Sequence, residues 1–163
     1  MERRFIKEKE ARKLLLEFFE KIGIDPQDKR KLNLPIELAN IDEYEIFFIN
    51  KKPIFAKSQN KLYPTLASDG ILLDLPRVIV NMGAIPYLCN GADVMAPGIV
   101  SFEGTFRKGD IVVVHDEQHQ KPLAITSALY NVEEAKRLQH GKVLQNIHYV
   151  GDKLWNTLKQ LKR

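Results

Sequence analysis

Residues 81–99, NMGAIPYLCNGADVMAPGI, decide the fold of the second half of this 163-residue chain. The stretch places three glycines and two prolines around a short helix that we expect to begin near Gly83. Asn81 is suited to cap that helix with its side-chain oxygen, and Gly91 to end it, because glycine adopts the left-handed conformation without a Cβ penalty. Small residues at Gly91 and Ala92 would let a ligand approach the main chain closely, although plain turn geometry explains the same residues.

Short β-prone runs surround this stretch on both sides. They are residues 78–80, 94–95, 99–100, 111–114, 122–130 and 147–150. Short strands separated by frequent turns predict a small barrel. Asn131 followed by Glu134 resembles a capping box for a brief helix that ends at Gly141. A C-terminal helix is expected to dock through apolar residues at helical spacing, which are Leu154, Trp155, Leu158 and Leu161.

The first half of the chain has a different pattern. Residues 8–22 carry apolar side chains at helical spacing and are followed by Gly23, which predicts an amphipathic helix. The β-rich run 44–49, the turn residues 50–53 and the run 54–56 predict a hairpin after it. We therefore predict an α+β fold with two domains. An N-terminal helix-plus-antiparallel-sheet domain spans residues 1–75, and a β pseudo-barrel with a C-terminal helix spans residues 76–163.

Composition and charge exclude several classes of protein. With 44% hydrophobic and 28% charged residues, the chain is expected to be globular, not disordered. The formal net charge is +4, but residues 76–150 hold seven basic and seven acidic side chains, and the excess lies in the tail. This balance neither establishes nor excludes RNA binding. A single cysteine and the lack of any apolar stretch near ~20 residues predict a cytoplasmic protein that is not inserted in a membrane.

Catalytic motifs are missing from the sequence. It contains no phosphate-binding G-x-x-x-x-G-K-[ST], no G-x-G-x-x-G and no G-x-S-x-G. His115 and His119 have a spacing that can bind zinc on a helix, but they fall at a strand end and in a polar loop, so surface histidines are the favoured interpretation. Cys89, beside Leu88 on a short helix, is interpreted as a small packed residue and not as a nucleophile. We expect no enzyme activity, no cofactor and no metal.

The pattern within residues 81–99 resembles that of the PUA domain, an RNA-binding pseudo-barrel. The matching positions are Gly83, Ala84, Gly91, Ala92, Val94, Met95, Pro97, Gly98 and Ile99. Two further stretches look like the malignant-T-cell-amplified-sequence proteins, which have a pre-PUA domain before the PUA domain. These stretches are Tyr63–Leu66 and Asn146–Tyr149, the latter with Asp152, Leu154 and Trp155.

This resemblance implies that RNA lies against the helix–strand junction, with the last strand flanking it. The junction residues expected to contact RNA are Gly91, Ala92, Asp93, Val94 and Met95, and those of the strand are His148 and Tyr149. The cations expected to pair with phosphates are Arg77, Arg107, Lys108 and Lys142. Tyr63 and Tyr87 are candidates for stacking on a base, although buried tyrosines with a satisfied hydroxyl are the commoner case.

The resemblance also implies a function. It indicates a non-catalytic factor that recognises tRNA, near its 3′ end, or small-subunit rRNA, and acts in translation initiation, reinitiation or ribosome recycling. Two alternatives stay open. One is an accessory RNA-recognition subunit of a tRNA or rRNA modification enzyme. The other is chiefly a protein-interaction module whose N-terminal domain docks a protein partner and exposes an apolar patch.

Overall fold

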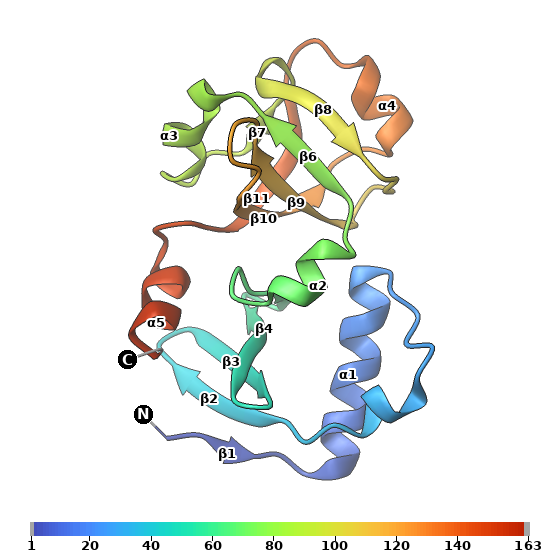
Figure 1. The fold of residues 1–163 in the computed structure, drawn as a ribbon, viewed down its shortest axis with the longest axis vertical. Coiled ribbons are helices and arrows are strands. Elements are labelled where there is room, and N and C mark those ends of the chain that lie inside the picture. The colour runs from blue at the N-terminus through green and yellow to red at the C-terminus, as the bar shows by residue number, and fades with distance from the viewer. Residues whose placement is uncertain (1, 162–163) are drawn as a thin grey trace. The chain divides into compact units, whose positions relative to one another are not determined.

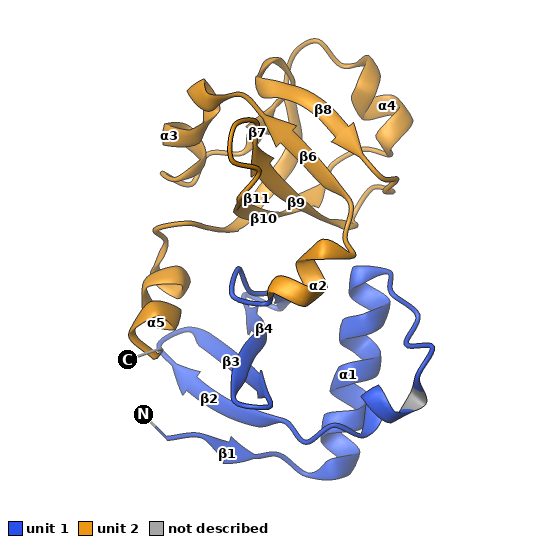
Figure 2. Cartoon of the chain, viewed as in Figure 1, with its two compact units in different colours: residues 1–68 blue, residues 69–163 orange. Residues whose placement is uncertain are grey.

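The protein, described by a computed structural model over residues 2–161 apart from the side chain of Lys29, divides into two compact units at Ser68/Asp69 (Figure 2). Each unit has its own sheet, and each is described separately below. The sequence favours a boundary after residue 75, whereas in the structure residues 69–75 belong to unit 2.

Unit 1 combines a long helix with an antiparallel sheet of five strands in the order β1-β2-β3-β4-β5 (Figure 1). Its elements in chain order are β1 (Arg4–Phe5), α1 (Glu8–Ile22), the 3₁₀ helix η1 (Lys29–Asn33), β2 (Glu37–Ile41), β3 (Tyr44–Ile49), β4 (Lys52–Ser58) and β5 (Lys61–Pro64).

The predicted first helix is confirmed, with the bounds read from the sequence. Gly23 ends it in the left-handed conformation, at φ +73°. Its apolar face is buried, and the ring of Phe18 stacks on that of Phe55 of β4 with centroids 4.3 Å apart. The ring of Phe47 of β3 also stacks on that of Phe55, with centroids 4.8 Å apart. Aromatic packing between helix and sheet therefore forms the core of unit 1.

Unit 2 holds a six-stranded mixed sheet in the order β7-β11-β10-β9-β6-β8. Its elements are α2 (Asp69–Leu73), β6 (Arg77–Val80), η2 (Met82–Ala84), α3 (Ile85–Leu88), β7 (Val94–Met95), η3 (Ala96–Gly98), β8 (Ile99–Glu103), β9 (Ile111–Asp116), β10 (Pro122–Ala128), α4 (Val132–Arg137), β11 (Lys142–Tyr149) and α5 (Lys153–Leu161).

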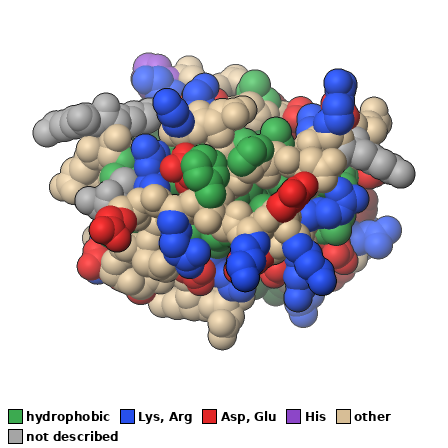
Figure 3. Space-filling model, turned by 90° about the horizontal axis from the view of Figure 1, so that it is seen from below, with side chains coloured by type: hydrophobic (Ala, Val, Ile, Leu, Met, Phe, Trp, Pro, Cys, Tyr) green, Lys and Arg blue, Asp and Glu red, His purple; other side chains and the backbone are tan. Residues whose placement is uncertain are grey.

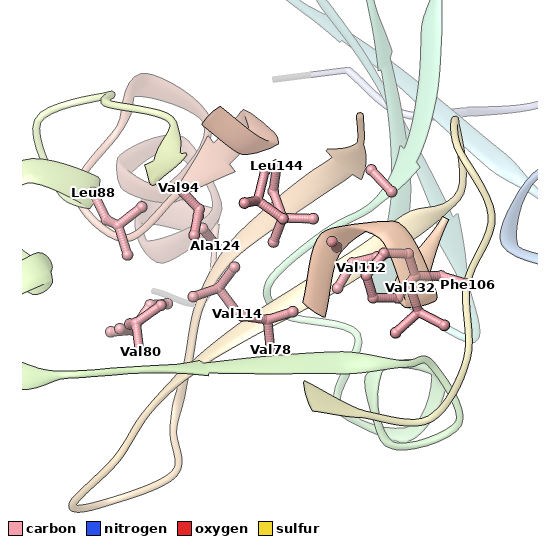
Figure 4. Packing of buried hydrophobic residues seen from close by; sticks show 14 residues of the cluster. Val78, Val80, Leu88, Val94, Phe106, Val112, Val114, Ala124, Val132 and Leu144 are labelled. Atoms are coloured by element: carbon pink, nitrogen blue, oxygen red, sulfur yellow. The ribbon is translucent and has the colours of Figure 1, made fainter. Parts of the chain in front are cut away.

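The sheet of unit 2 must curl, because its two outermost strands are neighbours in sequence. Only the three residues of η3 separate β7 from β8. Among the described strands β6 and β9 form a parallel pair, and the other pairings are antiparallel. The curled sheet encloses one apolar cluster, with Leu88 and Val94 at one end and Phe106 and Val132 at the other (Figure 4). The predicted α+β fold, with a helix and an antiparallel sheet followed by a β pseudo-barrel, is therefore confirmed.

Three local expectations in unit 2 are wrong. The side chain of Asn131 makes no cap bond to α4, because its Oδ1 instead accepts the N–H of Lys108 at 2.9 Å. The helix after it ends at Arg137 and does not extend to Gly141. In α5, Leu154 and Leu158 are buried as expected, but Trp155 is only half-buried. The ammonium of Lys159 lies over the Trp155 ring, 3.9 Å from its centroid.

Candidate nucleic-acid interface

The stretch that follows β6 is held in a compact loop by its first residue. Asn81 caps η2, because its Oδ1 accepts the N–H of Ala84 at 3.0 Å, as the sequence predicted. The N–H of Asn81 donates to the carbonyl oxygen of Gly98 at 3.0 Å, which ties the start of the loop to its end. A Cβ on Gly98 would lie 3.4 Å from the Cβ of Ala84, so the two ends approach closely.

The turn after α3 depends on Gly91. Its φ is +94°, a region that glycine adopts without strain. A Cβ at this position would lie 3.2 Å from the hydroxyl oxygen of Tyr149 on β11. The turn is closed by hydrogen bonds from the N–H groups of Asn90 and Ala92 to the carbonyl oxygen of Tyr87. Gly91 therefore serves both the turn and the contact with the neighbouring strand.

These segments enclose a pocket of about 350 Å³. It is lined by Val80, Asn81, Gly83, Ala84, Tyr87, Leu88, Ala92, Asp93, Val94, Met95, Pro97 and Gly98. Leu88 and Val94 also belong to the core cluster, so its apolar floor is continuous with the barrel interior. At its rim, Tyr87 is 70% exposed and Met95 is 45% exposed. An apolar cavity with an exposed aromatic ring suits the flat face of an unpaired base.

Charge at the pocket is almost neutralised within the protein. Asp93 is the one charged residue of the lining. Its Oδ2 lies 3.3 Å from the ammonium of Lys142, and its Oδ1 accepts the N–H of Asn146 at 2.8 Å. The Lys142 side chain is 63% exposed, so this pair contributes little to stability, while the ammonium remains accessible from solvent. The pocket thus offers apolar surface with one cation at its edge.

The structure brings together most of the residues expected at the junction. Ala92, Asp93, Val94 and Met95 line the pocket, and Gly91 lies beside them. Lys142 pairs with Asp93. The ring of Tyr149 lies under Gly91. That these residues contact RNA stays a prediction.

Three of the predicted cations lie away from the pocket. Arg77 begins β6, whereas the pocket lies beyond the end of that strand. Its guanidinium pairs with Glu103 at 3.4 Å. Arg107 and Lys108 lie just before β9, which runs parallel to β6, and Arg107 lines a separate polar pocket. The sequence could not show that these cations and the pocket lie at opposite ends of β6 and β9, because the two ends of a short strand are only a few residues apart in the chain.

His148 is not available to a ligand from solvent. Its side chain is 1% exposed, and its Nδ1 lies 2.8 Å from Oδ2 of Asp152. Asp152 also accepts the N–H groups of Tyr149 and Trp155. Burial raises the pKa of Asp152, but the hydrogen bond and charge of His148, with these N–H groups, outweigh burial and lower it. We therefore assign His148 to the joint between β11 and α5 and not to direct contact with RNA.

The structure also places the two candidate tyrosines, Cys89 and the two histidines of the sequence analysis. Tyr63 is buried, and its hydroxyl lies 2.7 Å from that of Ser58, so it is a buried tyrosine with a satisfied hydroxyl. Tyr87 is exposed at the pocket and remains free to stack. Burial raises the pKa of the Cys89 thiol, so little thiolate forms near neutral pH. His119 is exposed, but His115 is buried, which corrects the expectation of two surface histidines.

Burial also lowers the pKa of His115, whose Nδ1 lies 2.8 Å from the carbonyl oxygen of Gln120. Within residues 2–161, no group of three His, Cys, Asp or Glu side chains is placed to hold a metal ion. Over the same residues, no helix combines the length and apolar character needed to cross a bilayer.

Asn81 and Asn146 are site residues that reasoning from chemistry did not single out as contacts. The sequence indicated Asn81 only as a helix cap, and in the structure it also lines the pocket. Asn146 entered only through the resemblance of its stretch, and it hydrogen-bonds to the residues around the α3 turn. The signal for Asn81 was its place before a glycine-rich turn, whereas Asn146 acts through a pairing across 53 residues or more of sequence.

Comparison with known proteins assigns both units. Residues 76–150 match the PUA domain, and residues 2–68 match a domain of unknown function, DUF1947. The uncharacterized protein MJ1432 of Methanocaldococcus jannaschii is 42% identical over 94% of this chain and 95% of its own length. Translation machinery-associated protein 20 of Saccharomyces cerevisiae is 30% identical over 71% of this chain and 67% of its own length. The chain belongs to the family of translation machinery-associated protein 20 and malignant T-cell-amplified sequence 1.

A solved structure of this architecture supports the assignment. A PUA-domain protein of Aeropyrum pernix, crystallised with tartrate, has a TM-score of 0.86 and 28% identity over 99% of this chain and 93% of that one. A more distant relative is an enzyme. Probable tRNA pseudouridine synthase B of Pyrobaculum islandicum is 37% identical over 48% of this chain, which covers 24% of that protein. Family membership supports RNA binding and a role connected with translation.

Proposed function

We propose that this protein is a non-catalytic cytoplasmic factor of translation that binds tRNA near its 3′ end, or small-subunit rRNA, through the pocket between α3 and β7. The role would be in initiation, reinitiation or ribosome recycling. The observation that carries the proposal is the apolar pocket with exposed Tyr87 at its rim, in a domain of the PUA family. A protein partner for unit 1 stays a prediction.

The lining of the pocket favours an unpaired nucleotide over a duplex. A duplex presents its phosphates outward, and its recognition needs several cations, whereas no Lys or Arg among the described residues lines this pocket. An unpaired base instead presents an apolar face that can stack on an aromatic ring. A single-stranded 3′ end or an rRNA loop supplies such a base.

Fluorescence anisotropy with tRNA tests the proposal. The full-length protein is titrated into tRNA with an intact and with a trimmed 3′ end. We expect affinity to fall by at least about tenfold on trimming, the equivalent of ~1.4 kcal/mol. Equal affinity for both RNAs would contradict recognition of the 3′ end. In that case, binding to isolated small ribosomal subunits decides between rRNA and no RNA ligand.

A substitution that fills the pocket locates the site. Ala92 is exposed and lines the pocket, so Ala92→Phe occupies it without burying a strained side chain. Leu73→Phe is the control, because Leu73 is 68% exposed on α2 and does not line the pocket. We expect the first variant to lose RNA affinity and the second to keep it. Unchanged binding by a folded Ala92→Phe would place the RNA elsewhere.

A further inference from the structure

The turn between α3 and β7 has little backbone pairing to hold it to the sheet. The ladder between β7 and β11 consists of Met95 opposite Lys142 and Val94 opposite Leu144. Before Val94 this ladder ends. The hydrogen bonds among residues 85–92 shape the turn internally and do not reach β11. Another group must therefore fix the position of the turn against the barrel.

Asn146 continues the contact between β11 and the turn with both its backbone N–H and its side-chain amide. Its N–H donates to Asp93 Oδ1 at 2.8 Å, and its Nδ2 donates to the carbonyl oxygens of Leu88 at 3.2 Å and Ala92 at 3.0 Å. All three of these partners line the pocket, but Asn146 does not. The side-chain amide of Asn146 on β11 thus binds both ends of the turn that forms one wall of the pocket.

The orientation of the Asn146 amide follows from its partners. Two carbonyl oxygens face it, so the NH₂ group must point toward them, because the reverse orientation would oppose oxygen to oxygen. In this orientation Oδ1 is buried and makes no hydrogen bond with the described protein atoms. A buried acceptor without a partner carries a free-energy cost, which the two donated bonds must offset.

We infer that Asn146 is a positioning residue for the pocket, because its side-chain amide keeps the pocket preformed by holding the carbonyl groups of Leu88 and Ala92 against β11. This inference rests on the proposed RNA-binding function of that pocket. The Lys142–Asp93 ion pair acts on the same wall but is exposed and therefore weaker. Without the Asn146 amide the turn keeps its internal bonds and the bond from the Asn146 backbone N–H to Asp93, but it loses the two bonds that fix Leu88 and Ala92 to β11. Affinity then falls with the fraction of molecules whose pocket is in the binding conformation.

Hydrogen exchange of the RNA-free, full-length protein provides the first test. In Asn146→Ala we expect amide exchange at residues 90–93 to rise by roughly tenfold, while exchange in β9 and β10 stays unchanged. Asn156→Ala is the matched control, because Asn156 also donates its Nδ2 to a carbonyl oxygen, that of Gly151, but on α5. The control should leave exchange at residues 90–93 unchanged. A rise spread equally over β9 and β10 would indicate global destabilisation and overturn the positioning role.

RNA affinity provides the second test. We expect Asn146→Ala to weaken tRNA binding by about tenfold and Asn156→Ala to leave it unchanged. Asn146→Asp should weaken it at least as much as Asn146→Ala. A carboxylate donates no hydrogen bond to Leu88 or Ala92, and it adds a negative charge beside Asp93. Wild-type affinity in an Asn146→Ala protein with faster exchange at residues 90–93 would overturn the inference. Absence of RNA binding by the wild type would instead overturn the proposed function, and the exchange result would stand by itself.

Discussion

Gly91 concentrates two constraints at a single residue. Its φ of +94° strains any residue with a Cβ, and the Tyr149 hydroxyl lies 3.2 Å from the place that a Cβ would take. Gly109 has nearly the same φ, +92°, but a Cβ there would meet nothing within 4 Å. Substitutions at the two glycines therefore distinguish the cost of backbone strain from the cost of the contact with Tyr149.

We expect Gly91→Ala to lower the free energy of unfolding by about 1–2 kcal/mol and Gly109→Ala by less. Urea unfolding of both variants measures the difference. Tyr149→Phe removes the hydroxyl that a Cβ at position 91 would meet. In a Tyr149→Phe background, Gly91→Ala should therefore lower the free energy of unfolding by only as much as Gly109→Ala does. Equal losses at the two glycines would show that the Tyr149 ring moves aside at no cost.

At the level of individual residues, local chemistry was readable from the sequence and burial was not. The cap at Asn81 follows from a side chain and a backbone three residues apart, and it was predicted. The burial of His148 depends on strand pairing and on Asp152, and the same residue was expected to face RNA. The exposure of Tyr87 likewise depends on which side of a four-residue helix faces the barrel, which a segment shorter than two turns does not define.

At the scale of the element, the carboxylate of Asp152 joins β11 to α5. It accepts the N–H of Trp155 at 2.7 Å in the first turn of α5 and the N–H of Tyr149 at the end of β11. It also accepts a hydrogen bond from His148 at 2.8 Å. We expect Asp152→Ala to lower the free energy of unfolding by about 1–2 kcal/mol, since the cap bond is lost. Asp152→Asn should cost less near neutral pH, because its amide oxygen can still cap the helix.

The lowered pKa of Asp152 gives these variants different pH dependence. A carboxyl whose pKa is lower in the folded protein contributes stability above its unfolded pKa of about 3.9, and loses it as the pH falls through the folded value. The stability gap between wild type and Asp152→Asn should therefore narrow as the pH falls below about 4. Urea unfolding across this range measures it. A gap that stays constant down to pH 3 would contradict the role of the charge.

Elements with strong periodicity were predictable, and those defined by their partners were not. Helix α1 follows from its apolar spacing and the glycine after it. Strand β2 has the sequence ELANI, whose Glu, Ala and Asn are depleted in strands, and it is a strand because β1 and β3 pair with it on either side. The same reasoning explains Asn131. The sequence predicted that its side chain caps α4, but the side chain accepts a hydrogen bond from the N–H of Lys108, which is distant in the sequence.

At the scale of the whole molecule, the arrangement of charge bears on how RNA would be bound. The chain carries a formal charge of +4, yet within the part of the chain that the structure describes no Lys or Arg lines the pocket, and Lys142 at its edge is paired with Asp93. On the face that Figure 3 presents, Lys and Arg side chains are interleaved with Asp and Glu and with hydrophobic side chains. Two cations of the basic tail, Lys162 and Arg163, lie outside the described residues. Binding through the pocket should therefore depend on stacking and apolar contact more than on neutralising phosphates.

This arrangement predicts a shallow salt dependence of RNA affinity. Each phosphate contact with a single strand contributes about −0.7 to the slope of log K against log salt, so one or two contacts give a slope between about −0.7 and −1.4. Anisotropy titrations of tRNA between low and moderate salt measure this slope, and Ala92→Phe should abolish the component that salt does not weaken. A slope steeper than about −4 would require six or more phosphate contacts. Since the pocket offers one accessible ammonium, such a slope would assign the affinity to basic side chains elsewhere on the chain and the pocket to a different ligand.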